Sequence, residues 1–593
     1  MSTNRKEPIW IYILFFLGLS VAITFPVLQN PTDLVIGDYR SDIWDHLWGH
    51  YRTEASLQEK GELPLYETRI NVPYGGILYH VDLLNSLIAL PLRAFFGATL
   101  SYNILVYAHL IFSGVATTLL ALRFVKSRIG AVTSGLLFTF APHMLTFTLA
   151  SGVANRLNIG WIPLFFLFFH QLYVTGKMRY ALFCGISFFC AAIGCWHYAF
   201  FIFMLTVPLS IWLMAAPLWN RWKYKIEMNL KPLYQSLILK RLLPVALLCG
   251  IGALPISQSA SGSISTGSSG IYQREHFTFW DGDAKLELIN DFAVLDLLLP
   301  FRMGLLTSYN YDLLYETTYL GYALLGFAMV GLWSKNPLKW LLLLLSLGFI
   351  VLSFGTDVFL HKQSTPIPNQ LFYLCARVIP YMTAQEVPWE YIIPATFCLS
   401  LLAASGIEHL LEKIPSTRWQ KVGGLELILL VCLELFFIAP TIVPIPVAST
   451  KVPSIYYELA KDKEDYAIFD YPTRRNKTAM IPTEYFFYQS VHHKGIPYAI
   501  KDSWMDMNEL WSQMTRLQQS GSANIDKAML NFSKNQQRRA FETFSKNNYR
   551  YIIVHKQFLS TESLRETKIF FSSHLGEPLF EDSDIVQFSL FQE

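Results

Sequence analysis

Long apolar runs recur through the first 443 residues of this chain, and they restrict its fold more than any other feature. Of the 593 residues, 52% are hydrophobic and 15% are charged, whereas soluble globular domains carry about 25% charged residues. An apolar run of about 20 residues can cross a lipid bilayer as a helix. The sequence therefore predicts a mainly α fold, a polytopic helical membrane bundle of about eleven spans. These spans lie near residues 9–28, 101–122, 131–150, 160–175, 180–196, 199–216, 242–257, 318–333, 340–356, 391–411 and 425–443.

The placement of basic residues orients the predicted spans. If the N-terminus is cytoplasmic, the inside segments together hold 18 Lys or Arg and three Glu. The first outside loop, residues 29–82, holds nine Asp or Glu and four Lys or Arg. This distribution follows the positive-inside rule. Segment 83–98 contains Pro91 and Arg93, and we interpret it as a helix along the outer interface because counting it as a span would invert the rest.

The last 150 residues have the composition of a soluble domain. We expect a transmembrane domain over residues 1–443, with an outside loop at 29–100, and an exoplasmic α/β domain over residues 444–593. The protein would then be a multi-pass protein of the cell (inner or plasma) membrane with a cytoplasmic N-terminus. The α/β domain is expected to contain strands at 466–472 and 549–555, helices at 481–492 and 560–573, and a closing hairpin.

The segment GDYRSDIWDHLWGHYR, residues 37–52, concentrates carboxylates and imidazoles just after the first predicted span. These side chains are Asp38, Asp42, Asp45, His46 and His50. Ionised carboxylates at a membrane surface are costly unless they are solvated or paired, so the cluster indicates a functional site. If Ser41 caps a helix, Asp42, Asp45 and His46 share one face. That face could hold a base against a hydroxyl, or bind a divalent cation through Asp42 and His46; alternatively, the carboxylates only solvate a loop and cap a helix.

Several stretches of the chain resemble one class of membrane enzyme. They are SDIWDHLW with GELPLYETRINVPYGG, SYNILVYAHLIFSG with LRFVKSRIGAVTSGLLFTFAPH, GVANRLNIGWIPLFF, YETTYLGYALLG, LSFGTDV with IPYMTAQEVPWEYIIPA, and FDYP with YIIVH. In order and spacing the chain is similar to GT-C glycosyltransferases, the polytopic class of the protein O-mannosyltransferases and the aminoarabinose transferase. The resemblance implies that an acidic residue of the first outside loop is the catalytic base or a metal ligand. The matching position is Asp42, with Asp38 and Asp45 as competitors.

The resemblance also implies a sugar donor carried on a polyprenyl phosphate in the membrane. The acceptor would be an envelope glycan, lipid or protein, and the small net charge of +3 gives no reason to expect nucleic acid. Guanidinium groups pair with phosphate oxygens, and aromatic rings can stack on sugars. The candidate substrate-binding residues are Arg52, Arg69, Arg156, Arg274, Arg302, Glu316 and Trp44. Arg156 could instead anchor a helix end, and Glu434 is expected to face a polar partner within the bundle.

Two other functions remain open at this point. A lipid or polysaccharide transporter or flippase would place polar residues across the bilayer depth, whereas the acidic residues here gather at one face. It would also often show paired broken helices in matching halves. The other alternative is a non-catalytic envelope assembly protein that keeps the GT-C-like fold.

Overall fold

The chain forms two compact units in the computed structural model. The first, called here the helical unit, comprises Met1–Asp38, Ser101–Gln258 and Phe277–Ala448. The second, called the α/β unit, comprises Tyr39–Leu100, Ser259–His276 and Ser449–Glu593. The outside loop thus groups with the C-terminal residues, whereas the sequence-based division assigned it to the transmembrane domain. The structure describes residues 9–64, 66–77, 82–224, 241–251, 293–300, 317–360, 365, 367–379, 382, 388–441, 443–473, 482–499 and 541–590.

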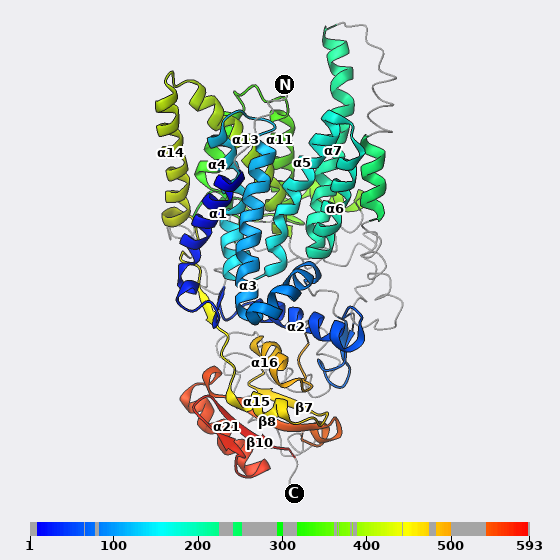
Figure 1. Cartoon of the computed structure of the whole chain (residues 1–593), viewed down its shortest axis with the longest axis vertical. Coiled ribbons are helices and arrows are strands. Elements are labelled where there is room, and N and C mark those ends of the chain that lie inside the picture. Colours follow the sequence, from blue (N-terminus) through cyan, green and yellow to red (C-terminus); the bar gives the residue numbers. More distant parts are fainter. Residues whose placement is uncertain are drawn as a thin grey trace. The chain divides into compact units, whose positions relative to one another are not determined.

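The helical unit is built almost entirely of helices that run side by side (Figure 1). Its longer helices are α1 (Ile9–Thr24), the second half of α3 (Leu83–Ala121), α4 (Arg128–Thr139), α5 (Trp161–Thr175), α6 (Met178–Gly194), α7 (Trp196–Tyr224), α10 (Tyr322–Gly331), α11 (Lys339–Ser353), α12 (Gln370–Val378), α13 (Ile392–Glu412) and α14 (Thr417–Leu433). Shorter pieces are η1 (Phe25–Gln29), η2 (Met144–Ala150), η3 (Ala154–Gly160), η5 (Val294–Leu297), η9 (Pro388–Tyr391) and η10 (Glu434–Ile438), with the strand pairs β1 (Leu34–Ile36) with β6 (Val447–Ser449) and β4 (Asp357–Val358) with β5 (Ile367–Pro368).

The helices support a multi-pass membrane protein but do not confirm eleven spans. Within the described ranges, five helical segments are long and apolar enough to cross a bilayer, or six if a bent pair counts as one. Three further predicted spans correspond to the shorter apolar helices α6, α10 and α11. On α1, Trp10 and Leu14 are exposed, as expected for side chains that face lipid. The inside and outside assignments stay a prediction.

Helix α13 is the core of the helical unit, since the apolar window of Pro388–Glu412 is completely buried. It packs closely on α10 because a glycine on each helix faces the backbone of the other helix. A Cβ atom at Gly406 would overlap the carbonyl oxygen of Phe327, and a Cβ atom at Gly331 would overlap that of Leu402. Small residues at helix contacts bring backbones together where the hydrophobic effect supplies no force between helices.

Two breaks interrupt long apolar helices. Helix α4 and the π-helix η2 form a pair bent by 54°, and Pro142 lies at the break. Helix α3 is broken at Gly97, whose φ of 74° and ψ of 179° are not helical, so the residues before Gly97 form a separate helix. The segment before Gly97 exposes Phe95 to 83% and also Ile88. A separate helix there agrees with the interpretation of residues 83–98 as distinct from the next span, although its place at an interface stays a prediction.

A carboxylate from a later part of the chain caps the N-terminus of α10. Glu434 accepts a hydrogen bond from the Tyr319 hydroxyl (2.7 Å), from the amide of Tyr322 and from the amide of Ala323 (2.8 Å). The first amides of a helix have no partners within it and favour a negative charge. The expectation that Glu434 faces a polar partner within the bundle is therefore confirmed.

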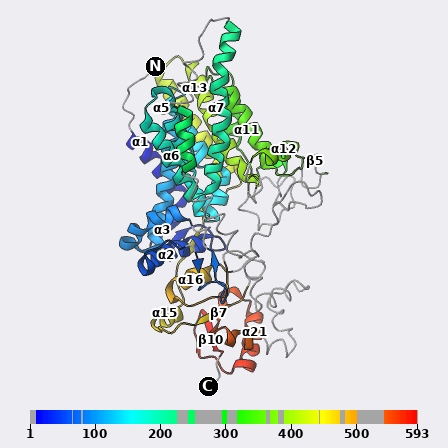
Figure 2. The same cartoon turned by 90° about the vertical axis from the view of Figure 1, so that its right-hand side faces the viewer.

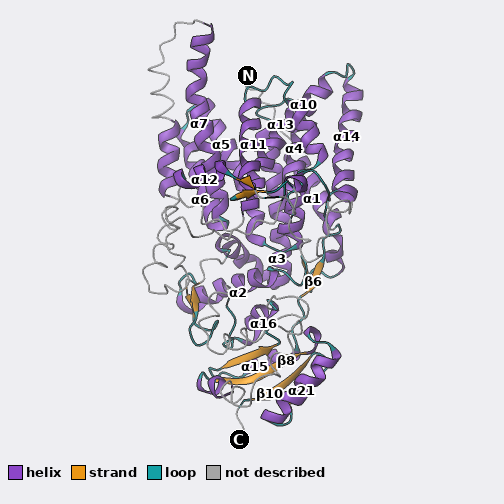
Figure 3. Cartoon of the chain, turned by 180° about the vertical axis from the view of Figure 1, so that it is seen from behind, coloured by secondary structure: helices purple, strands orange, loops and turns teal. Residues whose placement is uncertain are grey.

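The α/β unit contains a four-stranded sheet in the order β7-β8-β10-β9, shown with its helices in Figure 3. Strands β7 (Ala467–Tyr471) and β8 (Tyr549–His555) are parallel, whereas β10 (Ile585–Ser589) is antiparallel to both β8 and β9 (Phe580–Glu581). These strands confirm the two predicted buried strands and the closing hairpin. The predicted helices are also present, as α16 (Glu484–His492) and α21 (Thr561–Leu575). The remaining elements are α2 (Ile43–Lys60), β2 (Tyr66–Glu67), β3 (Gly76–Ile77), α15 (Ser454–Lys461), η11 (Lys556–Phe558) and the first part of α3.

Candidate active site

Helix α2 carries the acidic cluster predicted from the sequence. It begins after Asp42, which is its N-cap residue, and it ends at Gly61, whose φ of 68° favours glycine. The helix therefore starts one residue later than a Ser41 cap would require. Asp45 lies in the first turn, where a negative charge is stabilised by the helix dipole. Asp42 is exposed and Asp45 is half-buried, so Asp42 is the more accessible of the two.

A fourth carboxylate, which sequence reasoning missed, lies beside His46. Asp82 Oδ2 is 3.9 Å from His46 Nδ1, and Asp82 is 3% exposed. The Asn85 side-chain amide donates to Asp82 at 2.6 Å. Burial raises the pKa of Asp82 to about 7, although the Asn85 hydrogen bonds oppose this. A carboxyl group with a pKa near neutrality is suited to proton transfer.

The sequence did carry a signal for Asp82. Asp82 immediately precedes a run that begins Leu-Leu-Asn and continues as an apolar helix, and Asp is favoured at such a start. Asp82 is the residue before α3, and its carbonyl accepts from the Ser86 amide at 2.8 Å. Its proximity to His46 could not be read from the sequence, because the two residues are 36 positions apart.

His50 lies one turn after His46 on α2, and it is 1% exposed. Burial lowers the pKa of His50 well below its ordinary value, and the charges of His46 and Arg93 lower it further. His50 is therefore neutral at neutral pH. Arg93 itself is paired with Glu54 at 2.8 Å.

The arginines predicted to bind donor phosphate lie in different surroundings. Arg52 is buried in an ion pair with Glu67, so an incoming phosphate would have to compete with that carboxylate. Arg69 is half-buried, and its backbone carbonyl accepts from Gln489 and Ile496. Their predicted binding roles, and that of Arg156, stay predictions. Arg274, Arg302 and Glu316 lie outside the described residues.

Trp44 packs inside the α/β unit. Its ring lies 5.4 Å from that of Phe487 and its indole nitrogen donates to the Tyr39 carbonyl at 2.7 Å. A sugar could stack on Trp44 only if the ring left these contacts. This observation gives Trp44 a packing role, and its predicted sugar contact stays untested.

The helical unit holds its own cluster of charged side chains. Glu390, at the start of the α13 segment, is 0% exposed. It lies 2.6 Å from Arg156 Nη2 of η3 and 2.5 Å from His197 Nδ1 of α7. The Tyr198 hydroxyl donates to the Arg156 carbonyl at 2.5 Å. The pairing with Glu390 agrees with the alternative in which Arg156 anchors a helix end.

Asp38 belongs to the helical unit, whereas Asp42 and Asp45 belong to the α/β unit. Asp38 is nearly buried, and its backbone amide donates to the Ala150 carbonyl at 2.7 Å. Asp42 is the most exposed of the three predicted carboxylates. Exposure alone does not assign the base, so all three stay candidates.

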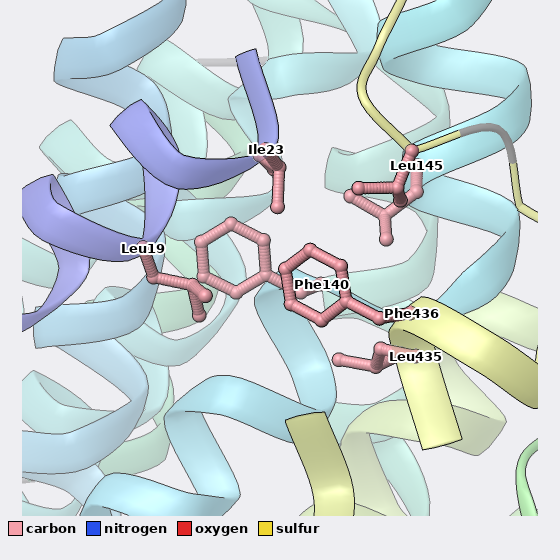
Figure 4. Close-up of a pocket in the computed structure, with 7 residues that line it drawn as sticks. Leu19, Ile23, Phe140, Leu145, Leu435 and Phe436 are labelled. Atoms are coloured by element: carbon pink, nitrogen blue, oxygen red, sulfur yellow. The ribbon is translucent and has the colours of Figure 1, made fainter. Parts of the chain in front are cut away.

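Two features of the described residues add nothing to the predicted site. No group of three or more His, Cys, Asp or Glu side chains there is arranged to hold a metal ion, so we derive no step through a cation. A small pocket in the helical unit is lined by apolar side chains and offers no polar group to a sugar phosphate (Figure 4). Its lining residues are Leu19, Ile23, Phe140, Leu145, Leu435, Phe436 and Val443.

The architecture of the chain is similar to that of solved membrane glycosyltransferases. The oligosaccharyltransferase AglB of Archaeoglobus fulgidus, in complex with an inhibitory peptide and a dolichol-phosphate, aligns with 93% of this chain and 70% of its own, at 12% identity and a TM-score of 0.50. The apo form of the Archaeoglobus fulgidus oligosaccharyltransferase aligns with 96% of this chain and 72% of its own, at 11% identity and a TM-score of 0.52. The chain has the GT-C fold. The predicted fold class is therefore confirmed.

Other comparisons add little to the GT-C assignment. The arabinofuranosyltransferase AftD from mycobacteria aligns with 100% of this chain and 42% of its own, at 12% identity and a TM-score of 0.49. No family model and no curated protein matches the chain. At such low identities the structural likeness establishes the GT-C fold, and the activity needs its own argument.

Proposed function

We propose that this protein is an integral membrane glycosyltransferase that takes a sugar from a polyprenyl-phosphate donor and transfers it to an exoplasmic acceptor. The observation that carries the proposal is an exposed carboxylate, Asp42, at the start of helix α2 in a chain with the GT-C fold. The sequence predicts that this helix lies in the first outside loop. The related oligosaccharyltransferase was solved with a dolichol-phosphate, which supports a lipid-linked donor here.

The proposed reaction is a single inverting displacement. The acceptor oxygen or nitrogen forms a bond to the anomeric carbon, the bond between that carbon and the phosphate oxygen breaks, and the polyprenyl phosphate leaves with the electron pair. Asp42 accepts the acceptor's proton, with Asp38 and Asp45 as alternative bases. General-base catalysis of this kind typically contributes about 10²- to 10⁴-fold to the rate.

Donor phosphate would be bound by arginine side chains. In the described part of the chain Arg69 is the more accessible candidate, because Arg52 is held by Glu67 and Arg156 by Glu390. The proposal also includes Arg274, Arg302 and Glu316 as substrate contacts, on the sequence alone. The acceptor class, whether glycan, lipid or protein, is left to experiment.

The test replaces Asp42 with Asn in cells that depend on the protein, with protein levels matched by immunoblot. We expect the glycan product measured by mass spectrometry to fall at least about 100-fold, and the lipid-linked sugar to accumulate in membrane extracts. Asp33→Asn is the matched control, since Asp33 is in the same loop and its carboxylate is bound to the Asn30 side chain at 2.8 Å.

Each negative result has a defined meaning. If Asp42→Asn leaves the glycan unchanged while Asp38→Asn or Asp45→Asn removes it, the base is reassigned. If the triple replacement also leaves the glycan unchanged, the transferase proposal fails and a non-catalytic assembly role replaces it.

A further inference from the structure

One face of α2 is docked on α16, and both helices belong to the α/β unit. Trp44, Trp48 and Tyr51 are spaced four and three residues apart, which places them on one helical stripe. Their rings lie 5.4 Å from Phe487, 5.7 Å from Phe486 and 5.4 Å from His493, respectively. The Tyr51 hydroxyl also hydrogen bonds with His493 Nδ1 at 2.6 Å. The C-terminal part of the chain therefore buries Trp44 and Trp48 and contacts Tyr51, which stays half-buried.

The acidic side chains lie away from this stripe on the same helix, Asp42 on the opposite side and Asp45 on the flank. At 100° per residue, Asp42 and His46 are each about 160° from Trp44 around the helix axis, and Asp45 is about 100° away. This separation agrees with the exposure of Asp42. Rotation of α2 about its axis is therefore fixed by the docked stripe and determines where the carboxylates point.

Gln489 of α16 is the polar centre of the docking. It is 3% exposed, and its Oε1 accepts from the Trp48 indole nitrogen at 2.7 Å. Its Nε2 donates to the Arg69 carbonyl at 2.7 Å and to the Lys494 carbonyl at 3.0 Å. One amide thus joins α2, the segment that follows it and the chain after α16. A buried amide with this many partners leaves several of them unsatisfied when it is removed.

The segment after α2 is also held by the C-terminal part of the unit. The Ile496 amide donates to the Arg69 carbonyl at 2.9 Å, the Val72 amide donates to the Ile496 carbonyl at 3.1 Å, and the Asn71 amide donates to the Tyr498 carbonyl at 2.8 Å. Just before α2, the Thr483 hydroxyl donates to the Ser41 carbonyl at 3.0 Å. Contacts at both ends leave α2 little freedom to move independently of α16.

We propose that the C-terminal part of the α/β unit, Ser449–Glu593, orients the acidic face of α2 for glycosyl transfer, and that Gln489 is the positioning residue. The inference rests on the proposed function, since it assumes that the carboxylates of α2 act on substrate. Gln489 itself touches no reacting atom. Residues 449–593 would therefore be required for the native rate of transfer even though they contribute no catalytic side chain.

The experiment compares Gln489→Leu with Gln557→Leu in the full chain. Gln557 is in the same unit and its amide contacts only the Tyr488 hydroxyl, at 3.4 Å, among the partners described. We expect Gln489→Leu to lower the rate of glycan formation about tenfold, with the lipid-linked donor accumulating, and the control to stay near the native rate. Hydrogen exchange of the α2 amides should accelerate about tenfold in Gln489→Leu, while exchange in β7 and β8 is unchanged.

Trp48→Phe is the second variant, because it removes the indole N–H that donates to Gln489, together with part of the buried ring, and leaves Gln489 in place. It should accelerate hydrogen exchange of the α2 amides and lower the rate of glycan formation severalfold, even if the Gln489→Leu protein fails to accumulate in cells. The inference is overturned if Asp42→Asn abolishes transfer while both docking variants keep the native rate and native α2 exchange. If Asp42→Asn leaves glycan transfer unchanged but hydrogen exchange of the α2 amides accelerates in the docking variants, the docking inference stands and the proposed function fails.

Discussion

Replacing Asp82 with asparagine should remove a pH-dependent loss of stability from the α/β unit. Burial raises the pKa of Asp82 from 3.8 to about 7, a difference of about three pH units. Each pH unit is worth about 1.4 kcal/mol, so full ionisation of Asp82 in the folded protein costs at most about 4 kcal/mol. Asparagine keeps the size and the polarity of the side chain but cannot ionise.

The direction of the effect follows from linkage. The folded state binds the Asp82 proton more tightly than the unfolded state does. The corresponding stability is fully present below about pH 4 and is lost as the pH rises through about 7. The native protein should therefore lose thermal stability between pH 4 and pH 8, whereas Asp82→Asn should lose less.

The assay is the unfolding temperature of the detergent-solubilised full chain at several pH values. About 2–4 °C per kcal/mol is expected for a domain of 150–250 residues, so the variant should exceed the native protein by about 10 °C at pH 8. The two proteins should agree near pH 4. Asp33→Asn serves as the control, since Asp33 is only half-buried. Equal slopes of unfolding temperature against pH in Asp82→Asn and native protein would refute the reasoning.

Two further variants test the helical unit. Glu390→Gln should destabilise the folded protein by about 3–5 kcal/mol, since it leaves the Arg156 guanidinium, whose side chain is 12% exposed, without its carboxylate. Size-exclusion recovery measures this, and addition of Arg156→Gln should restore part of the loss. Gly406→Leu should prevent α10 and α13 from packing, because even a Cβ atom there overlaps the Phe327 carbonyl. Gly348→Leu, a position with nothing within 4 Å of an added Cβ, should be tolerated, and equal recovery of the two glycine variants would contradict the packing argument.

Local patterns predicted much of the fold. Strands β7 and β8 and the closing hairpin could be predicted because β7, β8 and β10 are short runs rich in β-branched and aromatic residues. The helical class was evident from the apolar runs, but the number of spans was not confirmed, since several helices are shorter than a bilayer is thick. Length alone does not separate a short span from a buried helix.

The surroundings of the site depended on contacts between distant segments. The acidic residues of α2 were found from their density in the sequence, but neither the pairing of Arg52 with Glu67 nor that of Arg156 with Glu390 could be inferred. The grouping of residues 39–100 with the C-terminal residues was missed for the same reason. Charge counts orient loops in a membrane, whereas they do not identify which elements those loops pack against.

The contact between Glu434 and α10 limits how this protein can be shortened. Two amide groups of α10 and the Tyr319 hydroxyl all depend on one carboxylate that lies more than 100 residues later in the chain. A truncation that stops before α14 would leave these donors without that carboxylate, and a buried donor without a partner costs about 1–3 kcal/mol. A minimal soluble-domain deletion should therefore be cut after η10, so that membrane insertion of the remaining helices, several of which Figure 2 shows from a second side, is preserved.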